Sequence, residues 1–396
     1  MEVPRGKNSQ PIQFLVLAPN EWTGQWMNRQ QLFSRIGRNN KVCYGNGAYY
    51  SWERNSPRFK QAPWRSTHEL LDNVHVFRSS KTILRWSALP AAEQWAIRRY
   101  CRKFTQPVAA SDSPKILYLF HPEFLPYIQN ISHDLLVYHA YDDFSKQGDH
   151  TDLEDLLIER ADLLLASSRA IKNSLENRSN RQDIHIVPNG VDFDHFATLQ
   201  SEPPDLAAIP HPRIGYIGSV NQKVDIALYA TLADILPMHN FIIIGNHGVM
   251  GQQQEALARA KKLNNIHFLE AKSLEKIPAY MQYMDINAMP YVTDETIWAS
   301  SGYPLKLHEY LAVGKPVISS AIDAVLEFEK VVSIPRSVSE WKNAIEKLVN
   351  GNQQVTAQQR QAVAKANQWN IRAEQIQFLI NEKLNKTVAH KIESKS

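Results

Sequence analysis

The sequence predicts an α/β protein with two doubly wound domains. Short runs rich in β-branched and aliphatic residues alternate with longer amphipathic stretches, a pattern typical of parallel sheets covered on both faces. Two such series occur, and the stretch between them, 193–212, contains four prolines and has no convincing periodicity. That stretch is predicted to be an interdomain linker. A chain of 396 residues is long enough for two separate cores.

In the first series, buried strands are predicted where aliphatic runs end in polar residues, and helices where apolar residues recur with helical period. The predicted strands are 12–18, 41–44, 74–77, 115–120, 135–138, 161–168 and 184–187. The predicted helices end near 36, span 91–104, and begin at 151 and 169. Residues 46–73 are rich in aromatic, basic and turn residues, and we interpret them as an insertion over a ligand-binding region.

The second series begins after the proline-rich stretch and follows the same logic. Its predicted strands are 213–217, 241–246, 266–269, 286–290 and 316–319. Its predicted helices are 224–236, 252–263, 273–284 and 304–313, followed by 341–348, 355–366 and 369–384. Every strand is thus connected to the next through a helix, which requires parallel pairing.

The stretch 300–319 combines a loop, a helix, a cap and a buried strand. Pro304 suits the first helical position, and Gly314 suits the left-handed residue that ends a helix. Lys306 and Glu309 are three residues apart and therefore lie on neighbouring faces of that helix. Lys306 could meet a phosphate, and Glu309 could accept hydrogen bonds from sugar hydroxyls. The alternative is a solvated ion pair on a surface helix.

This stretch resembles the donor-site signature of GT-B glycosyltransferases of the group 1, family 4-like type. In that family a glutamate near the start of the helix binds the nucleotide ribose, and Glu309 matches it. The fuller pattern has a second glutamate eight positions earlier, where this chain has Ser301. The segment Val-Pro-Asn-Gly-Val-Asp at 187–192 resembles the end of the family's N-terminal domain. Residues 139–145 resemble a subset of the family that acts in polysaccharide and teichuronic acid synthesis.

The resemblance implies a GT-B fold, with two Rossmann-like domains facing a cleft and a C-terminal helix crossing back to the first. We expect an acceptor-side domain at 1–198, a nucleotide-sugar domain at 199–366, and a crossover helix and tail at 367–396. The implied function is a hexosyltransferase-type glycosyltransferase of class EC 2.4. It would move a sugar from a nucleotide-sugar donor to a lipid-linked, polysaccharide or other glycan acceptor.

Two other functions share this fold. One is an inactive scaffold of a polysaccharide synthesis complex, an idea to which Ser301 gives weight. The other is a nucleotide-sugar 2-epimerase, which would release its sugar to water. A basic, aromatic acceptor-side region disfavours the epimerase, whose corresponding surface should be neutral or acidic.

Breaking a sugar–diphosphate bond requires positive charge and N–H donors around the leaving group. The predicted donor-binding residues are Gly24, Gly218, Ser219, Lys223, Ser301, Gly302, Lys306 and Glu309. For Lys223 the alternative is a solvated loop lysine, and for Gly24 a simple tight turn. The resemblance implies that no metal and no cofactor are needed, because GT-B enzymes typically use positively charged groups where other glycosyltransferases use Mn²⁺.

The acceptor hydroxyl needs a base, or a leaving phosphate that takes its proton. Asp143, Asp142 and His139 are the catalytic candidates, because strand ends of open α/β sheets collect ligand-binding groups. The alternative for them is a turn and capping cluster, in which Asp is common. The resemblance favours retention at the anomeric carbon, whereas Asp143 as a base would suit inversion. His121 is a weaker candidate.

Charge is distributed unevenly along the chain. Residues 1–115 contain 18 Lys and Arg against 7 Asp and Glu, interleaved with aromatic residues. We expect residues 50–105 to meet an anionic membrane surface or an anionic acceptor; the alternative is an ordinary solvated face over buried tryptophans. Nucleic acid is not expected as a partner, because no nucleic-acid module accompanies the charge.

Two cysteines without metal or disulfide spacing favour a reducing compartment. No early apolar run is long enough to span a bilayer, and we read no signal peptide. The sequence therefore predicts a cytoplasmic protein, able to lie peripherally on the inner face of the cell membrane.

Overall fold

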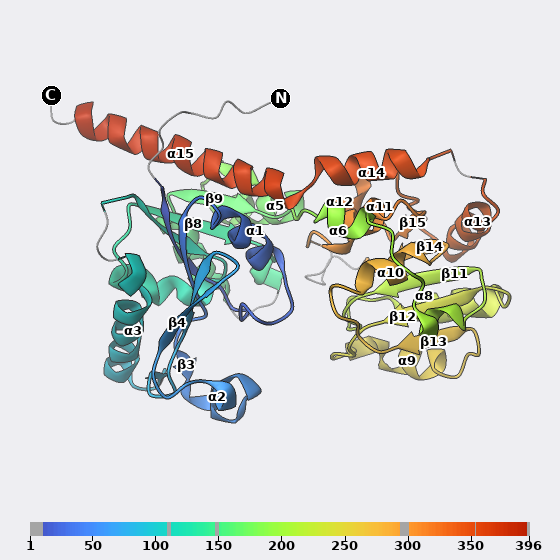
Figure 1. Cartoon of the computed structure of the whole chain (residues 1–396), viewed down its shortest axis with the longest axis horizontal. Helices are drawn as coiled ribbons and strands as arrows, with labels where there is room; N and C mark the ends of the chain where they lie inside the picture. Colours follow the sequence, from blue (N-terminus) through green and yellow to red (C-terminus); the bar gives the residue numbers. More distant parts are fainter. Residues whose placement is uncertain (1–10, 109–111, 147–149, 294–300, 353, 394–396) are drawn as a thin grey trace. The chain divides into compact units, whose positions relative to one another are not determined.

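The computed structural model describes residues 11–108, 112–146, 150–293, 301–352 and 354–393, without the side chains of 387–393. The chain divides into two compact units. Unit 1 contains residues up to Ser167, Ile171–Pro188 and the C-terminal segment from Asn370. Unit 2 contains Ser168–Ala170 and Asn189–Trp369. Each unit is an α/β body with a mainly parallel sheet, as predicted (Figure 1).

Unit 1 contains an eight-stranded sheet in the order β10-β9-β8-β7-β1-β2-β5-β4. All neighbouring strands are parallel except β4, which pairs antiparallel with β5. The strands are β1 (Gln13–Leu17), β2 (Lys41–Gly45), β4 (Thr67–Leu71), β5 (Val74–Arg78), β7 (Lys115–Leu119), β8 (Leu135–Ala140), β9 (Leu163–Ala166) and β10 (Ile184–Ile186). The order reverses at β1, so the strand ends beside it form the topological switch point where such sheets bind ligands.

Helices cover this sheet and bury its aliphatic side chains in one core. They are α1 (Asn28–Ile36), α3 (Pro90–Phe104), α4 (Thr151–Arg160), α5 (Arg169–Arg178), and the 3₁₀ segments η2 (Gln106–Val108), η3 (Pro122–Asn130) and η4 (Phe144–Lys146). The strand β4 was not predicted, because its residues are mostly exposed and it lies at an edge. A turn with positive φ at Asp72 and Asn73 joins it to β5.

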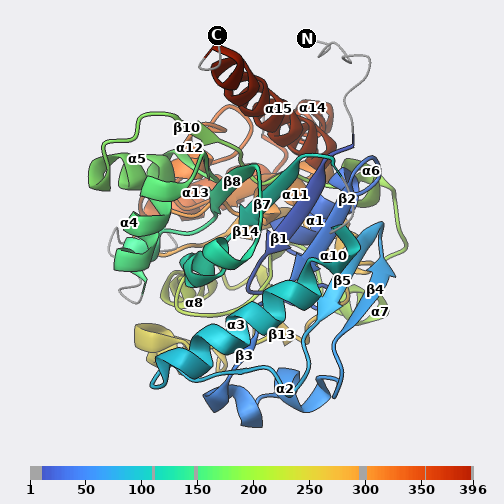
Figure 2. The ribbon, with the colours of Figure 1, turned by 90° about the vertical axis from the view of Figure 1, so that its left-hand side faces the viewer.

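The segment 46–73 is more regular than its composition suggested. It contains β3 (Tyr49–Tyr50), η1 (Ser51–Asn55) and α2 (Pro57–Gln61), and β3 pairs with β6 (Leu84–Arg85). Figure 2 shows that α3 lies on the same side of unit 1 as β3 and α2. Four tryptophans of this region are exposed rather than buried in the core, namely Trp52, Trp64, Trp86 and Trp95. Tyr100 and Phe104 are buried in the core.

Unit 2 contains a five-stranded parallel sheet in the order β13-β12-β11-β14-β15. Its strands are β11 (Arg213–Ile217), β12 (Asn240–Ile244), β13 (Ile266–Leu269), β14 (Ile286–Met289) and β15 (Val317–Ser319). Its helices are α6 (Phe193–Ala197), α7 (Pro204–Ala207), α8 (Ile226–Ile235), η5 (Gly251–Gln253), α9 (Gln254–Ala260), α10 (Ile277–Gln282), α11 (Lys306–Ala312), α12 (Asp323–Leu326), α13 (Val338–Val349) and α14 (Ala357–Ala366). The sheet is covered by helices and reverses its order at β11, so this unit too is doubly wound.

The prediction that residues 193–212 form an interdomain linker is wrong. Residues 193–212 form α6 and α7, and Phe196, Leu206 and Ile209 are buried in the core of unit 2. The sequence did not predict this packing, because prolines and helices of four or five residues produce no recognisable hydrophobic periodicity. The chain passes from unit 1 to unit 2 at Pro188–Asn189, and returns at Trp369–Asn370.

The last helix, α15 (Trp369–Glu393), belongs to unit 1 from Asn370 onwards. Ala373, Ile376 and Ile380 are buried. Gln377 accepts a hydrogen bond from Asn40 at 2.8 Å. Over the residues whose structure is described, no helix combines the length and the apolar character needed to cross a bilayer.

The helix α11 starts at Lys306, so Pro304 precedes it and is not its first residue as predicted. Its predicted end is confirmed, because Gly314 has φ +77°. Arg360 of α14 donates to the carbonyl of Gly314 at 3.0 Å, and Gln361 donates to that of Ala312 at 3.1 Å. The helix α14 therefore satisfies the carbonyl groups at which α11 ends.

We expect Gly314→Ala to lower the free energy of unfolding by about 1–2 kcal/mol, the cost of a left-handed residue that carries a Cβ. The new Cβ would also lie 3.2 Å from the Cβ of Ala357. Gly351→Ala is the matched control for the backbone cost alone, since Gly351 also has a left-handed φ of +72° but no atom lies within 4 Å of the added Cβ. The difference between the two variants reports the contact with Ala357. Urea unfolding of both variants measures the difference. Equal stability of Gly314→Ala and the parent protein would contradict the assigned cap.

Candidate active site

The turn that follows β11 brings two backbone segments and a lysine into very close contact. Gly218 has φ +146°, and its amide donates to the carbonyl of Ile244 at 2.8 Å. A Cβ on Gly218 would lie 2.7 Å from Nζ of Lys306, and a Cβ on Gly245 would lie 2.1 Å from the carbonyl oxygen of Gly218. The backbone contact therefore requires glycine at position 245, the positive φ favours glycine at position 218, and the predicted pair Gly218 and Lys306 lies together.

Lys306 is held by two tyrosines. Its Nζ donates to the hydroxyl of Tyr291 at 3.1 Å and to that of Tyr216 at 3.4 Å. The same nitrogen lies 4.6 Å from the ring centre of Tyr216 and 5.5 Å from that of Tyr291. Burial raises the pKa of Tyr216 to about 12, so this hydroxyl stays neutral. In the described part of the chain the nearest carboxyl group to act on this charge is that of Glu309, whose pKa Lys306 lowers.

Glu309 lies one turn further along α11 and is partly exposed. Burial raises the pKa of its carboxyl group to about 7, and the charge of Lys306 opposes that shift. The helix that carries both residues is fixed to the sheet, because the amide of Ile217 donates to the hydroxyl of Tyr310 at 2.9 Å. A carboxyl group near its pKa at neutral pH can accept hydrogen bonds from sugar hydroxyls once it is ionised.

The other predicted donor residues of unit 2 surround this centre to different degrees. Ser219 is exposed, and its carbonyl accepts from the hydroxyl of Tyr216 at 2.9 Å. The carbonyl of Lys223 accepts from the amide of Val292 at 2.9 Å, beside Tyr291. Both residues therefore lie on the loop that borders the two tyrosines.

Ser301 lies further from solvent, at 3% exposure, and its carbonyl accepts from the hydroxyl of Ser168 at 2.5 Å. Gly302 follows it and is partly exposed. Ser300, which begins the signature stretch, lies outside the described residues. The environment of Ser301 is that of a buried, hydrogen-bonded loop residue.

The three catalytic candidates of unit 1 differ in their environments. His139 is 1% exposed, and its Nδ1 lies 2.7 Å from the hydroxyl of Tyr118. Burial lowers the pKa of His139 to about 3, so it is neutral at physiological pH. Asp143 is 3% exposed and accepts from the hydroxyls of Ser145 and Ser174 at 2.5 and 3.1 Å. These contacts favour structural roles for both residues.

Asp142 is the partly exposed member of the trio. Its carboxylate accepts from the amide of Asp143 at 3.1 Å, as in the turn cluster considered as the alternative. Gly24 is exposed and forms a turn with the carbonyl of Glu21 at 3.3 Å. An added Cβ there would be in ordinary contact at 3.4 Å, so no close approach requires this glycine.

Sequence reasoning missed several residues that shape these sites. Two tyrosines, Tyr216 and Tyr291, position Lys306, and Gly245 allows the close approach of Gly218. No sequence spacing identifies these residues, because they lie far from one another in the chain. Arg29 of α1 is a buried charge that the sequence pattern did not reveal. It is 1% exposed, donates to Asn20, and lies 3.9 Å from the ring centre of Tyr141.

No group of three or more histidine, cysteine, aspartate or glutamate side chains suited to a metal ion occurs among the residues that the structure describes. The expectation that no metal is needed remains a prediction.

Comparison with known proteins adds independent findings. Residues 211–351 match the family described as glycosyl transferases group 1. The chain is 28% identical over 181 residues to a protein of Bacillus subtilis strain 168, provisionally named a teichuronic acid biosynthesis glycosyltransferase, TuaH. That match covers 44% of each chain, and the chain spans about half the length of the curated relatives it matches.

Solved structures match over nearly the whole chain. HepE of Anabaena in complex with UDP-glucose aligns with TM-score 0.67 and 16% identity, over 93% of this chain and 99% of its own. Sucrose-phosphate synthase of Thermosynechococcus elongatus aligns with TM-score 0.70 and 14% identity, over 94% and 99%. At such identities the likeness concerns the fold, which is that of GT-B glycosyltransferases. Residues 211–351, within the second α/β unit, thus match the group 1 glycosyltransferase family, and the fold of the chain resembles that of GT-B glycosyltransferases.

Proposed function

We propose that this protein transfers a sugar from a nucleotide-sugar donor to a glycan or lipid-linked acceptor. The observation that carries the proposal is the Lys306 site, a cation held by tyrosine hydroxyls against the glycine turn at Gly218. A diphosphate leaving group gains negative charge as the glycosidic bond breaks, and a fixed cation beside backbone N–H groups stabilises that charge. The similarity to HepE, solved with UDP-glucose, makes a UDP-sugar the first donor to test.

In this proposal Glu309 binds the donor ribose, and Gly218, Ser219, Lys223 and Gly302 border the diphosphate. The carboxyl group of Glu309 has a pKa of about 7 and can therefore be ionised at physiological pH. Asp142 is the acceptor-side carboxylate nearest solvent among the three candidates and is proposed as the residue that faces the acceptor hydroxyl. Loss of turnover in Asp142→Asn with unchanged donor affinity would support that role, and full turnover would exclude it.

The first test is thermal unfolding of the full chain with UDP, GDP, dTDP and ADP, in the absence of divalent metal. A nucleotide at 100 times its Kd should add about 2.7 kcal/mol of stability. We expect one nucleotide to raise the unfolding midpoint, and Lys306→Met to reduce that shift while leaving the response to the free nucleoside unchanged. Lys330→Met, an exposed lysine of the same unit, is the control.

If the parent protein responded to none of these nucleotides, the inactive scaffold would become the better reading. The replacement of the family's first glutamate by Ser301 would then be the change to investigate. A nucleotide sugar hydrolysed without any acceptor, with inversion of the 2-substituent, would instead indicate the epimerase.

The raised pKa of Glu309 predicts how donor binding varies with pH. Ribose hydroxyls donate to the ionised carboxylate, so the affinity for UDP-glucose should increase as pH rises through about 7 and then level off. UDP-glucose suits this measurement because its diphosphate is substituted at both ends and does not titrate near neutrality. Glu309→Gln should bind about 10–100-fold more weakly at pH 8, the loss of a charge-assisted hydrogen bond, with a flat profile. A flat profile in the parent protein would contradict the ribose assignment.

We also propose that the surface around residues 50–105 contacts anionic lipid. Three exposed tryptophans carry cations over their rings: Arg54 lies 5.1 Å from Trp86, Lys81 lies 5.5 Å from Trp64, and Arg99 lies 5.2 Å from Trp95. Paired aromatic and basic side chains of this kind suit the interface between headgroups and acyl chains.

This contact predicts salt-dependent sedimentation with vesicles containing phosphatidylglycerol. The bound fraction should fall as salt rises from about 0.05 to about 0.5 M, because the Debye length shortens across that range. Replacing Trp64, Trp86 and Trp95 together by alanine should weaken binding at every salt concentration. Equal binding to neutral phosphatidylcholine vesicles would argue against the electrostatic contact.

A further inference from the structure

Unit 1 contains a cavity of about 330 Å³ at the carboxyl end of its sheet, within the size range of small-molecule sites. Aromatic side chains form much of its wall, and polar side chains complete it. Its lining includes Tyr50, Trp52, Glu53, Arg58, Arg85 and Glu123. None of these residues has a role in the site described above.

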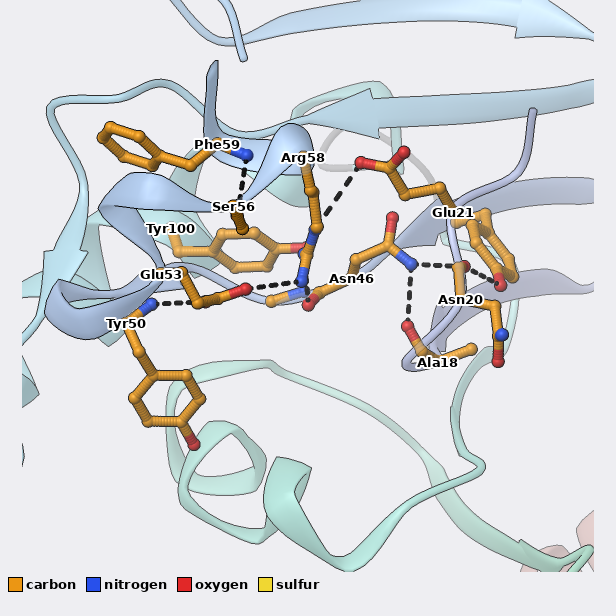
Figure 3. Close-up of polar contacts among 12 residues, drawn as sticks. Ala18, Asn20, Glu21, Asn46, Tyr50, Glu53, Ser56, Arg58, Phe59 and Tyr100 are labelled. Carbon is orange, nitrogen blue, oxygen red and sulfur yellow. Dashed lines mark hydrogen bonds and ion pairs between the residues drawn. The ribbon is translucent and has the colours of Figure 1, made fainter. Parts of the chain in front are cut away.

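The cavity is bordered by a fixed segment. Arg58 lies within ion-pair distance of Glu21 at 3.5 Å and Glu53 at 3.3 Å, and donates to the carbonyl of Asn46 at 3.1 Å. Asn46 in turn donates to the carbonyl of Ala18, at the end of β1 (Figure 3). The Arg58 contacts therefore tie η1 and α2 to the strand ends of the sheet.

Both arginines of the cavity wall already have acidic partners. Besides the two carboxylates around Arg58, the guanidinium of Arg85 binds Glu93 through Nε at 2.6 Å and through Nη2 at 2.5 Å. Each of the two guanidinium groups thus already forms an ion pair with a carboxylate of this protein. The wall therefore offers little net attraction for a phosphate or carboxylate group.

Glu123 is the carboxylate of the wall without a cationic partner of this kind. Over the described residues, its neighbour at ion-pair range is His121, 3.7 Å away. The Nδ1 of His121 accepts from the amide of Glu123, and burial lowers the pKa of this imidazole to about 3, so it is neutral. Burial raises the pKa of Glu123, and the charges of Arg85 and Arg58 oppose that shift without a direct ion pair among the described residues. Its carboxyl oxygens are therefore suited to accept from hydroxyl donors.

Trp52 supplies an apolar platform. Its ring stacks on that of Tyr50 with a centroid distance of 4.1 Å and an interplanar angle of 20°. The side chain remains 63% exposed, so the ring surface not covered by Tyr50 is accessible. An aromatic surface beside hydrogen-bond acceptors matches a sugar ring, which presents apolar C–H faces and a rim of hydroxyl groups.

We propose that this cavity binds an uncharged sugar ring of the acceptor, stacked against Trp52 with its hydroxyls donating to Glu123. The inference deepens the proposed function, and rests on it for the identification of the ligand as the acceptor. The cavity is connected to the strand ends that carry the catalytic candidates. His150 of its wall packs against His121, and His121 packs against Phe144, next to Asp143. The preferred sugar is neutral, because an anionic ring would meet the carboxyl group of Glu123 and two arginines that already have ion pairs.

The test uses ligand-observed NMR titration of the full chain with methyl glycosides that differ in charge at one position. The neutral probes are methyl glucoside, methyl galactoside and methyl N-acetylglucosaminide, and the charged probes are methyl glucuronide and methyl galacturonide. We expect at least one neutral glycoside to bind about tenfold more tightly than the uronides. Trp52→Ala should abolish that binding, Trp52→Phe should restore part of it, and Trp64→Ala should leave it unchanged.

Charge reversal at Glu123 gives an independent result. Glu123→Lys should shift the preference towards the uronides, and Glu123→Gln should weaken neutral binding without creating that shift. Tighter binding of a uronide than of its neutral counterpart by the parent protein would overturn the proposal. So would absence of neutral binding, or neutral binding that persists in Trp52→Ala.

Nucleotide-induced thermal shifts on the same preparations separate this inference from the proposed function. A nucleotide response without neutral glycoside binding would overturn the cavity assignment alone. Trp52-dependent glycoside binding without any nucleotide response would support a neutral-sugar site while removing the proposed transferase activity.

Discussion

The geometry of unit 2 depends on the contact between the Gly218 turn and its two neighbours. The carbonyl of Gly218 leaves no space for a side chain at Gly245, and the α-carbon of Gly218 leaves none between itself and Lys306. The end of β11 and the end of β12 are therefore in direct backbone contact, and the side chain of Lys306 at the start of α11 packs against them. A lysine held in this way loses little conformational freedom when an anion binds, which is the condition for effective electrostatic stabilisation.

Much of the fold could be predicted because parallel sheets and amphipathic helices leave strong patterns. The strands near 13, 115, 213 and 241 were predicted because aliphatic runs buried on both faces are rare elsewhere. The edge strand β4 and the short helices α6 and α7 were not, since exposed strands and helices of four or five residues carry too little periodicity. Their position depends on the cores they pack against.

The candidate site shows the same division. Lys306, Glu309 and Gly218 could be chosen from local spacing and from the family resemblance. Tyr216 and Tyr291 could not, because their importance comes from contacts with one lysine that lies 90 and 15 residues away from them in the sequence. In unit 1 the spacing identified a polar strand end but did not indicate that His139 and Asp143 would face buried hydroxyl partners. Burial of a polar group depends on tertiary packing and is rarely visible in sequence.

The Arg58 contacts have a consequence for how this protein could diversify. The cavity wall is built mainly from short elements outside the large sheet, and the guanidinium of Arg58 is one of the groups that attach them to the strand ends. Substitutions in residues 50–56 other than Glu53 can therefore change the shape and polarity of the wall while the Arg58 contacts remain in place. As long as Arg58 and its partners persist, the wall of this cavity can vary among homologous chains while its attachment to the strand ends stays the same.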